Sequence, residues 1–173
     1  MKSARSSVTG AEAMFDYRIR AATLDDVDVL VHHRLAMFTD MGLPMDVKAV
    51  GLAFKDWVTR MLRAGTFRAW VVETPSGDVV AGGGMTILPW PPGPLNLGDN
   101  LAFVYNVYTE PSHRRRGLAR MVMEAIHAWC REAGITAAAL NSSTEGQPLY
   151  ESLGYSVRTN PMMVNSLKVR TGG

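Results

Sequence analysis

The segment from Val107 to Arg120 constrains the fold of this chain more than any other part of its sequence. It begins within a nearly uninterrupted apolar run, Leu101 to Thr109, in which Asn106 is the exception. Such a run is typical of a strand that is buried on both faces. A proline-bearing turn, three consecutive arginines and Gly117 then lead into a helical pattern. We therefore expect a buried strand that passes through a basic turn into the N-terminus of a helix.

The helix after this turn is expected over Leu118 to Ala133, with Gly134 ending it. The first turn of a helix leaves several backbone N–H groups without partners and carries a partial positive charge, and together these favour a bound anion. Gly117 and Ala119 have little or no side chain, so a phosphate could approach the backbone closely. A phosphate site is therefore one interpretation of the basic turn.

Two other interpretations remain open from the residues alone. Charge by itself favours a solvated basic helix start over any binding site. Nucleic-acid binding is the third interpretation, although a formal net charge of only +2 argues against a strongly nucleic-acid-binding chain. The placement of Gly117 and Ala119 between a buried strand and a helix favours the phosphate.

Hydrophobic periodicity assigns the remaining elements to one domain without internal repeats. Two helices are expected near the N-terminus, one beginning at the capping signal Thr23 to Asp26 and one capped by Asp46. The other expected elements are strands over Tyr17 to Arg20, Phe67 to Glu73, Val79 to Leu88, Ile135 to Leu140 and two pieces within Tyr155 to Leu167, and a short helix over Pro148 to Leu153. No helix follows Gly82 to Gly84, so these glycines predict a bulge or a close backbone approach rather than a phosphate loop.

Composition bounds the class of protein. A chain of 173 residues, 47% of them hydrophobic, is long enough for one domain with a sizeable core. The single cysteine, Cys130, cannot form an intramolecular disulfide and is typical of a reducing compartment. No apolar run approaches the roughly 20 residues that a membrane-spanning helix needs. We expect a cytoplasmic protein in which residues 1–15 are a flexible tail and residues 16–173 form one domain.

Two motifs resemble those of the GNAT superfamily of acyl-CoA-dependent N-acetyltransferases. Arg114-Arg115-Arg116-Gly117-Leu118-Ala119 matches the family's signature Arg/Gln-x-x-Gly-x-Gly/Ala, which follows the fourth strand. The segment from Leu140 to Tyr155 is similar to the family's fifth strand, fourth helix and closing Leu-Tyr-x-x-x-Gly-Phe/Tyr. The resemblance runs from about Tyr17 to Leu167. It departs from the family at Ser143, where many relatives carry an asparagine seven residues before the tyrosine.

The resemblance implies an α/β fold in a single domain. We expect a mixed central sheet of about six to seven strands with about four helices, splayed between strands 4 and 5. In the family, the backbone amides of the basic turn bind the coenzyme A pyrophosphate, and the exposed edge of strand 4 pairs with the pantetheine arm. The coenzyme A contacts implied here are Val107, Thr109, Arg114, Arg115, Arg116, Gly117, Leu118, Ala119, Arg120 and Ser143.

The implied activity is the transfer of an acetyl group from acetyl-CoA to a primary amine of a small molecule or peptide by direct attack. The family places the hydroxyl of the tyrosine that corresponds to Tyr150 beside the coenzyme A sulfur, so Tyr150 is the implied catalytic residue. A non-catalytic acyl-CoA-binding sensor is the alternative function. The expected partner is the amine acceptor, with no nucleic acid and no membrane, and a homodimer is compatible with this class.

Other side chains give weaker signals. Glu110 and Asp99 are the two candidates for a general base, and a backbone N–H near Val107 is the expected oxyanion donor. Trp90, in the Pro-rich loop, could equally line the acceptor site or pack the loop down.

The four histidines form no set with zinc-ligand spacing, so no metal is expected. His32 and His33 are expected near the polar side of the first helix. Cys130 lacks an evident activating base, so it is not expected to act as a nucleophile.

Overall fold

The computed structural model describes residues 16–94, 96–158 and 163–164, which form one sheet with helices on both faces. The strands are β1 (Arg18–Ala21), β2 (Phe67–Glu73), β3 (Val79–Pro89), β4 (Asn100–Thr109) and β5 (Ala138–Leu140). The helices are α1 (Val27–Asp40), α2 (Val47–Arg63), α3 (Leu118–Glu132) and α4 (Gln147–Ser152), with single 3-10 turns η2 (Leu24–Asp26) and η3 (Pro111–His113). The expected capping box is present, because Thr23 and Asp26 exchange hydrogen bonds at the start of η2.

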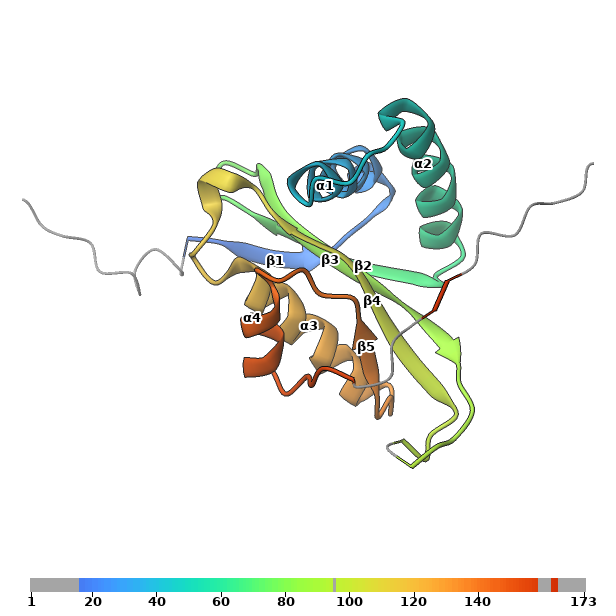
Figure 1. Ribbon diagram of the computed structural model, residues 1–173. Coiled ribbons are helices and arrows are strands. Elements are labelled where there is room, and N and C mark those ends of the chain that lie inside the picture. Colours follow the sequence, from blue (N-terminus) through green and yellow to red (C-terminus); the bar gives the residue numbers. More distant parts are fainter. Residues whose placement is uncertain (1–15, 95, 159–162, 165–173) are drawn as a thin grey trace, which may run out of the picture.

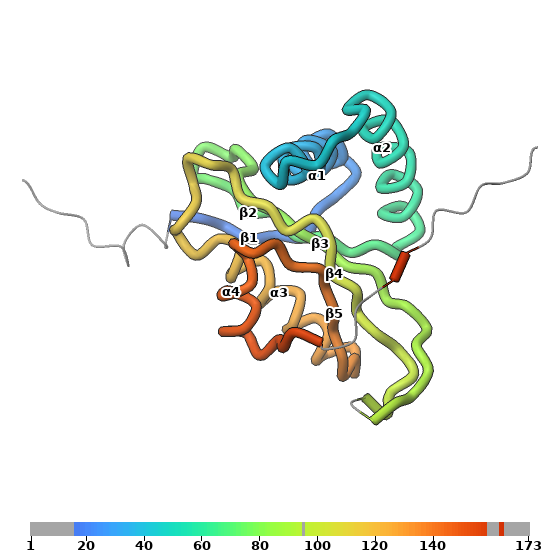
Figure 2. Tube along the Cα trace, viewed as in Figure 1, coloured from blue at the N-terminus to red at the C-terminus, as the bar shows by residue number. Residues whose placement is uncertain are grey.

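The strands lie in the order β1-β2-β3-β4-β5, and every neighbouring pair is antiparallel except β4 and β5, which are parallel. Figure 1 shows α1 and α2 over one face of this sheet and α3 and α4 over the other. The tube in Figure 2 follows the same path and shows the β3–β4 hairpin extending away from the helices. A mixed sheet covered on both faces confirms the expected α/β class and the four helices.

The expected six to seven strands are not confirmed, because the described residues form five. Tyr155 to Arg158 do not form a strand. Tyr155 instead packs against α3, where its hydroxyl and His127 Nε2 lie 2.9 Å apart in a hydrogen bond. The rest of the segment expected to form the last strands lies outside the described residues, apart from residues 163–164, which are not in a strand. Residues 1–15, expected to form a tail, also lie outside the described part of the chain.

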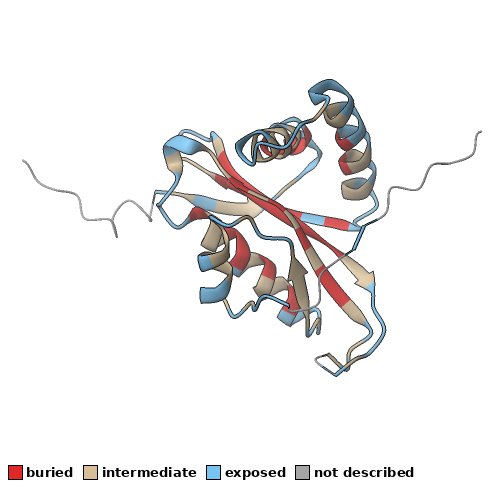
Figure 3. Cartoon of the chain, viewed as in Figure 1, coloured by how far each residue is buried: buried red, intermediate tan, exposed pale blue. Residues whose placement is uncertain are grey.

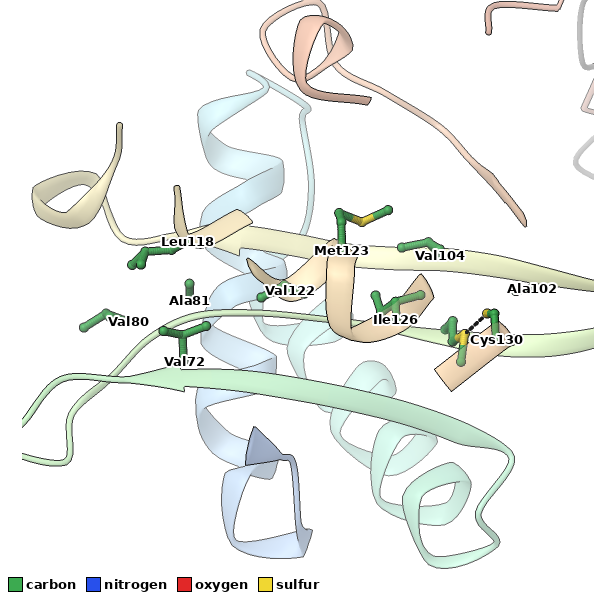
Figure 4. Close-up of a cluster of buried hydrophobic side chains, with 11 residues drawn as sticks. Val72, Val80, Ala81, Ala102, Val104, Leu118, Val122, Met123, Ile126 and Cys130 are labelled. Atoms are coloured by element: carbon green, nitrogen blue, oxygen red, sulfur yellow. Dashed lines mark hydrogen bonds between the residues drawn. The ribbon is translucent and has the colours of Figure 1, made fainter. Parts of the chain in front are cut away.

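Two apolar clusters hold the layers together. On one face the amphipathic helix α3 buries Val122 and Ile126 completely against the sheet, as Figure 4 shows. On the other face α1 and α2 bury Leu30 and Val58. Burial is concentrated along the central strands between these layers, as Figure 3 shows. No helix in the described ranges is long and apolar enough to cross a bilayer.

Cys130 belongs to the core on the α3 face. Its thiol is buried and lies 3.5 Å from the sulfur of Met85. Burial raises the pKa of the Cys130 thiol, which disfavours the thiolate that a nucleophile would need. The structure therefore agrees with the expectation that Cys130 is not a nucleophile.

A β-bulge interrupts the pairing of β3 with β4. The register shifts so that one residue of β3, Gly83, lies opposite two residues of β4, Asn106 and Val107. Asn106 adopts a left-handed backbone conformation with φ 60°. The neighbouring Gly84 is needed because a Cβ there would lie 2.6 Å from the carbonyl oxygen of Arg68. The glycine run thus marks a close backbone approach on β3, while the extra residue of the bulge belongs to β4.

Candidate functional site

The basic turn leaves a row of main-chain N–H groups free at the start of α3. Gly117 is the N-cap with φ 80°, and Arg115 is also left-handed with φ 62°. Met121 is the first residue of α3 whose N–H is bound within the helix, to Gly117 O at 3.0 Å. The N–H groups of residues 115–120 have no acceptor among the residues that the structure describes. A row of free N–H groups at a helix N-terminus is a geometry that favours a bound anion.

Arg114 is the arginine of the turn that the fold itself uses. Its Nε donates to Thr109 O at 3.0 Å, and its guanidinium forms an ion pair with Asp40 at the end of α1. The guanidinium also lies over the ring of Tyr108, 5.5 Å from the ring centre. These contacts tie the turn to α1 and β4. No local sequence pattern indicates the contact with Asp40, because 74 residues separate the two positions.

The other arginines of the turn are less restrained. Arg116 donates to the Tyr17 hydroxyl at 3.2 Å, and Arg120 donates to Ser152 Oγ at 2.6 Å, which joins α3 to α4. Arg115 has no side-chain hydrogen bond or ion pair within the described ranges. The side chain of Arg115 is thus the one with the most freedom to meet an anion at the turn.

The edge of β4 beside β5 is open in its second half. β5 pairs with β4 only as far as Val104. The N–H of Ala102 donates toward β5 at 3.0 Å, whereas the N–H of Glu110 donates to β3 at 2.8 Å. In a regular strand the N–H groups of residues separated by an even number of positions point to the same edge. Those of Ala102 and Glu110 point to opposite edges, so the bulge reverses the alternation of N–H directions along β4. The N–H groups of Val107 and Thr109 therefore face the open edge.

Tyr150 lies on α4, partly buried against the α3-side core. Its ring packs edge-on against Tyr155, with ring centres 6.0 Å apart. Burial raises the pKa of the Tyr150 phenol, so it stays protonated at neutral pH. Its hydroxyl forms no hydrogen bond to any residue that the structure describes. A protonated hydroxyl without a partner is available as a hydrogen-bond donor.

Ser143 has a structural contact that the sequence did not predict. Its Oγ accepts a hydrogen bond from the N–H of Gly146 at 3.1 Å, and its carbonyl accepts from Gly146 and Gln147. Ser143 thereby shapes the turn that begins α4. Its hydroxyl hydrogen is not used by this contact, so a donor remains.

The expectation that both histidines of α1 lie near the polar side of the helix is wrong for His33. His32 is exposed, but His33 is completely buried. Because it follows Leu30 by three residues, His33 shares the face of α1 that packs on the sheet. That helical spacing was the signal that could have placed it. Burial lowers the pKa of His33 to about 4, so its ring is neutral at pH 7.

Glu110 lies at the end of β4, on the same side of the sheet as α1. Its carboxylate lies 2.7 Å from His32 Nε2 and 3.6 Å from His33 Nε2. Asp99 precedes β4 at the opposite end, roughly 30 Å from Glu110 for a strand of this length. Of the two candidate bases, Glu110 alone lies at the end of β4 that carries the basic turn.

Trp90 lies at the far end of the β3–β4 hairpin with Asp99, and it is 48% exposed. It therefore neither packs the loop down closely nor approaches the basic turn. No group of three or more histidine, cysteine or acidic side chains within the described residues could hold a metal ion.

The chain matches the model of a known protein family and several solved structures. The model of the acetyltransferase (GNAT) family matches residues 31–155. A solved structure of a GCN5-related N-acetyltransferase from Ralstonia eutropha JMP134 is similar, with a TM-score of 0.79 and 33% sequence identity. The match covers 86% of this chain and 98% of that one.

More distant solved structures share the fold. A predicted acetyltransferase with acetyl-CoA from Clostridium acetobutylicum has a TM-score of 0.78 and 21% identity, over 86% of this chain and 96% of that one. A glucosamine-6-phosphate N-acetyltransferase from Arabidopsis thaliana has a TM-score of 0.64 and 18% identity, over 86% of this chain and 97% of that one. At these identities the likeness is one of fold alone.

Proposed function

Because this chain belongs to the acetyltransferase (GNAT) family and is an acyltransferase, we propose that it transfers an acetyl group from acetyl-CoA directly to a primary amine. The acceptor is a small molecule or a peptide. One observation carries the proposal: free main-chain groups extend from Val107 and Thr109 on the open edge of β4 to the N–H groups of residues 115–120. The amide-bearing pantetheine arm and the pyrophosphate of coenzyme A are complementary to these two sets of groups.

The residues of the turn would hold the pyrophosphate mainly through the backbone. The N–H groups of residues 115–120 supply the donors, and Gly117 and Ala119 leave space for the phosphate oxygens. The free guanidinium of Arg115 adds a charge-assisted contact, whereas Arg114 acts by orienting the turn. Ser143 would donate its free hydroxyl hydrogen to the pantetheine arm.

The attacking amine must be neutral. An amine with a pKa of about 10.4 is only roughly 0.04% neutral at pH 7, which adds about 4.6 kcal/mol to the barrier unless a base removes the proton. We assign Glu110 as this base, acting through water, because its carboxylate lies on the α1 side of the sheet and contacts the exposed His32. His32 then provides a route by which the proton reaches solvent.

Two groups stabilise the charges that develop during transfer. Bound acetyl-CoA supplies the thioester, and the N–H of Val107 at the bulge would donate to its carbonyl oxygen as negative charge develops there. Tyr150 donates a hydrogen bond to the departing sulfur. A phenol with a pKa of about 10 facing a thiol of about 8.5 makes full proton transfer uphill by roughly 2 kcal/mol, and burial of Tyr150 raises this further. Tyr150 therefore stabilises the thiolate rather than protonating it fully.

The test has two parts on the full chain. Calorimetry with acetyl-CoA measures binding, for which we expect a dissociation constant in the micromolar range, and a screen of primary amines for release of free coenzyme A thiol measures transfer. Absence of binding by folded protein would overturn the proposal. Binding without thiol release from any amine pool would instead favour a non-catalytic acyl-CoA sensor.

A further inference from the structure

Arg34 of α1 stands out because it is partly buried and has no anionic partner. Its guanidinium lies between two phenylalanine rings, 4.7 Å from the centre of Phe38 and 4.7 Å from the centre of Phe54. It takes part in no hydrogen bond and no ion pair with any residue that the structure describes. A guanidinium has five N–H donors, so this one keeps all of them available.

The sequence leaves few candidates to neutralise this charge. Of the 16 acidic side chains, only Glu12 falls outside the described residues. Burial lowers the pKa of Arg34, and the one ionisable group that opposes this shift is Tyr105, not a carboxylate. A desolvated cation without a counter-ion is unfavourable unless a partner of opposite charge arrives from outside.

The position of Arg34 relates it to the site of transfer. Leu30, one helical turn before Arg34, accepts a hydrogen bond through its carbonyl from the side-chain amide of Asn106 at the bulge, at 3.2 Å. Residues four apart lie on the same face of a helix, about 6 Å apart along its axis. Tyr105, the neighbour of Asn106 on β4, lies on the same side of the sheet and bonds Thr86 Oγ1 at 3.0 Å. Arg34 therefore lies against Phe38 of α1 and Phe54 of α2, about one turn of α1 from the residue that contacts the bulge.

We propose that Arg34 binds an anionic group of the acceptor, so that the substrate is a small amine or peptide carrying a carboxylate or phosphate about one helical turn from its reactive nitrogen. The two rings position the planar guanidinium and partly desolvate it, which favours bidentate recognition of an oxyanion. This inference rests on the proposed function, since it assumes that the amine is acetylated at the bulge.

Paired amines that differ only in the anionic group test the inference. Suitable pairs are alanine with alaninamide, glycylglycine with glycylglycinamide, and O-phosphoethanolamine with ethanolamine. The first two pairs report on a carboxylate at two distances and the third on a phosphate. The rate of thiol release gives kcat/KM for each amine. Each value is calculated on the concentration of the neutral amine, so that differences in amine pKa do not affect the comparison. We expect the anionic member of at least one pair to be preferred on the order of 100-fold.

Arg34→Gln should bring that preference close to one, and Arg34→Lys should keep part of it because the charge remains without the planar fork. Arg60→Gln is the matched control: it removes the same charge from an exposed position on α2 and should leave the preference intact. If Arg34 serves only to pack against Phe38 and Phe54, Arg34→Gln should change kcat/KM by the same factor for both members of each pair. It should also lower the thermal stability of the protein. Equal kcat/KM values within every wild-type pair, or a preference that survives in Arg34→Gln, would overturn the inference.

A second readout separates this inference from the proposed function. If no amine releases thiol, the proposed function fails, and calorimetry of the same pairs with coenzyme A-loaded protein decides the role of Arg34. Tighter binding of an anionic member that Arg34→Gln abolishes supports the anion site even then. Absence of any such preference in binding overturns it.

Discussion

The side-chain amide of Asn106 donates a hydrogen bond to the main-chain carbonyl of Leu30, and this contact joins the bulge of β4 to α1. Asn106 tolerates the left-handed conformation at φ 60° better than most residues, so one side chain both permits the bulge and fixes it to the helix. The bulge in turn directs the N–H of Val107 to the open edge of β4. Asn106 therefore fixes the bulge that opens this edge of β4.

Substituting Asn106 should separate these two effects. Asn106→Gly keeps the left-handed conformation but removes the bond to Leu30, so the free energy of unfolding should fall by about 1 kcal/mol. Asn106→Ala adds the strain of a Cβ in this conformation, so the loss should reach about 2 kcal/mol or more. Denaturant unfolding measures both. Equal losses for the two variants would show that the left-handed conformation carries no strain at this position.

Gly117→Glu should abolish acetyl-CoA binding. The new side chain would put bulk and negative charge at the N-terminus of α3, where the pyrophosphate is proposed to bind. Gly134→Glu is the matched control, since Gly134 has φ 71° at the other end of the same helix and its substitution brings similar backbone strain. Calorimetry should show binding by the Gly134 variant alone. Wild-type affinity in Gly117→Glu would remove the pyrophosphate from this turn.

Tyr150→Phe should slow the chemical step by about 10-fold to 1,000-fold while acetyl-CoA binding persists. Its hydroxyl has no partner in the described part of the chain, so stability should change little. Tyr155→Phe is the control: it loses the bond to His127 and about 1 kcal/mol of stability, but the chemical step should continue at the wild-type rate. Single-turnover kinetics measures the step itself. An unchanged rate in Tyr150→Phe would rule out its role at the leaving sulfur.

Glu110→Gln should lower kcat/KM by about 100-fold at pH 7 with an amine acceptor of ordinary basicity. The loss should shrink as the pH approaches the amine pKa of about 10.4, because the amine then reaches the site already neutral. A pH–rate profile of both proteins measures this. A loss that is the same at every pH would assign Glu110 a positioning role instead of that of a base.

Buried His33 should make the fold sensitive to acid. Its pKa is about 4 in the folded chain and about 6.5 when unfolded, so between these values the unfolded chain binds a proton that the folded chain does not. The free energy of unfolding should therefore fall as the pH drops from 6.5 to 4, by about 3 kcal/mol in total. His33→Gln should remove this part of the pH dependence, whereas His32→Gln should retain it. Denaturant unfolding across this pH range measures the effect, and an unchanged profile in His33→Gln would contradict it.

Local sequence patterns determined most of the elements and the turn that leads into α3. The apolar run ending at Thr109 and the basic turn with Gly117 predicted a strand followed by a helix, and the structure has both. They were predictable because a strand alternation, a helix period and a helix N-terminus are each specified by residues close together in the chain. The capping box at Thr23 was predictable for the same reason.

Only the tertiary structure decided the contacts between segments far apart in sequence. It brought Asp40 to Arg114, buried His33 against β4, placed Asp99 and Trp90 at the far end of the hairpin, and set Arg34 between Phe38 and Phe54. No local pattern encodes these contacts, because they depend on how α1 and α2 pack across the sheet. The bulge shows the same limit: the glycines of β3 indicated an irregularity, but the packing against β2 and α1 decided that β4 carries the extra residue and opens its edge.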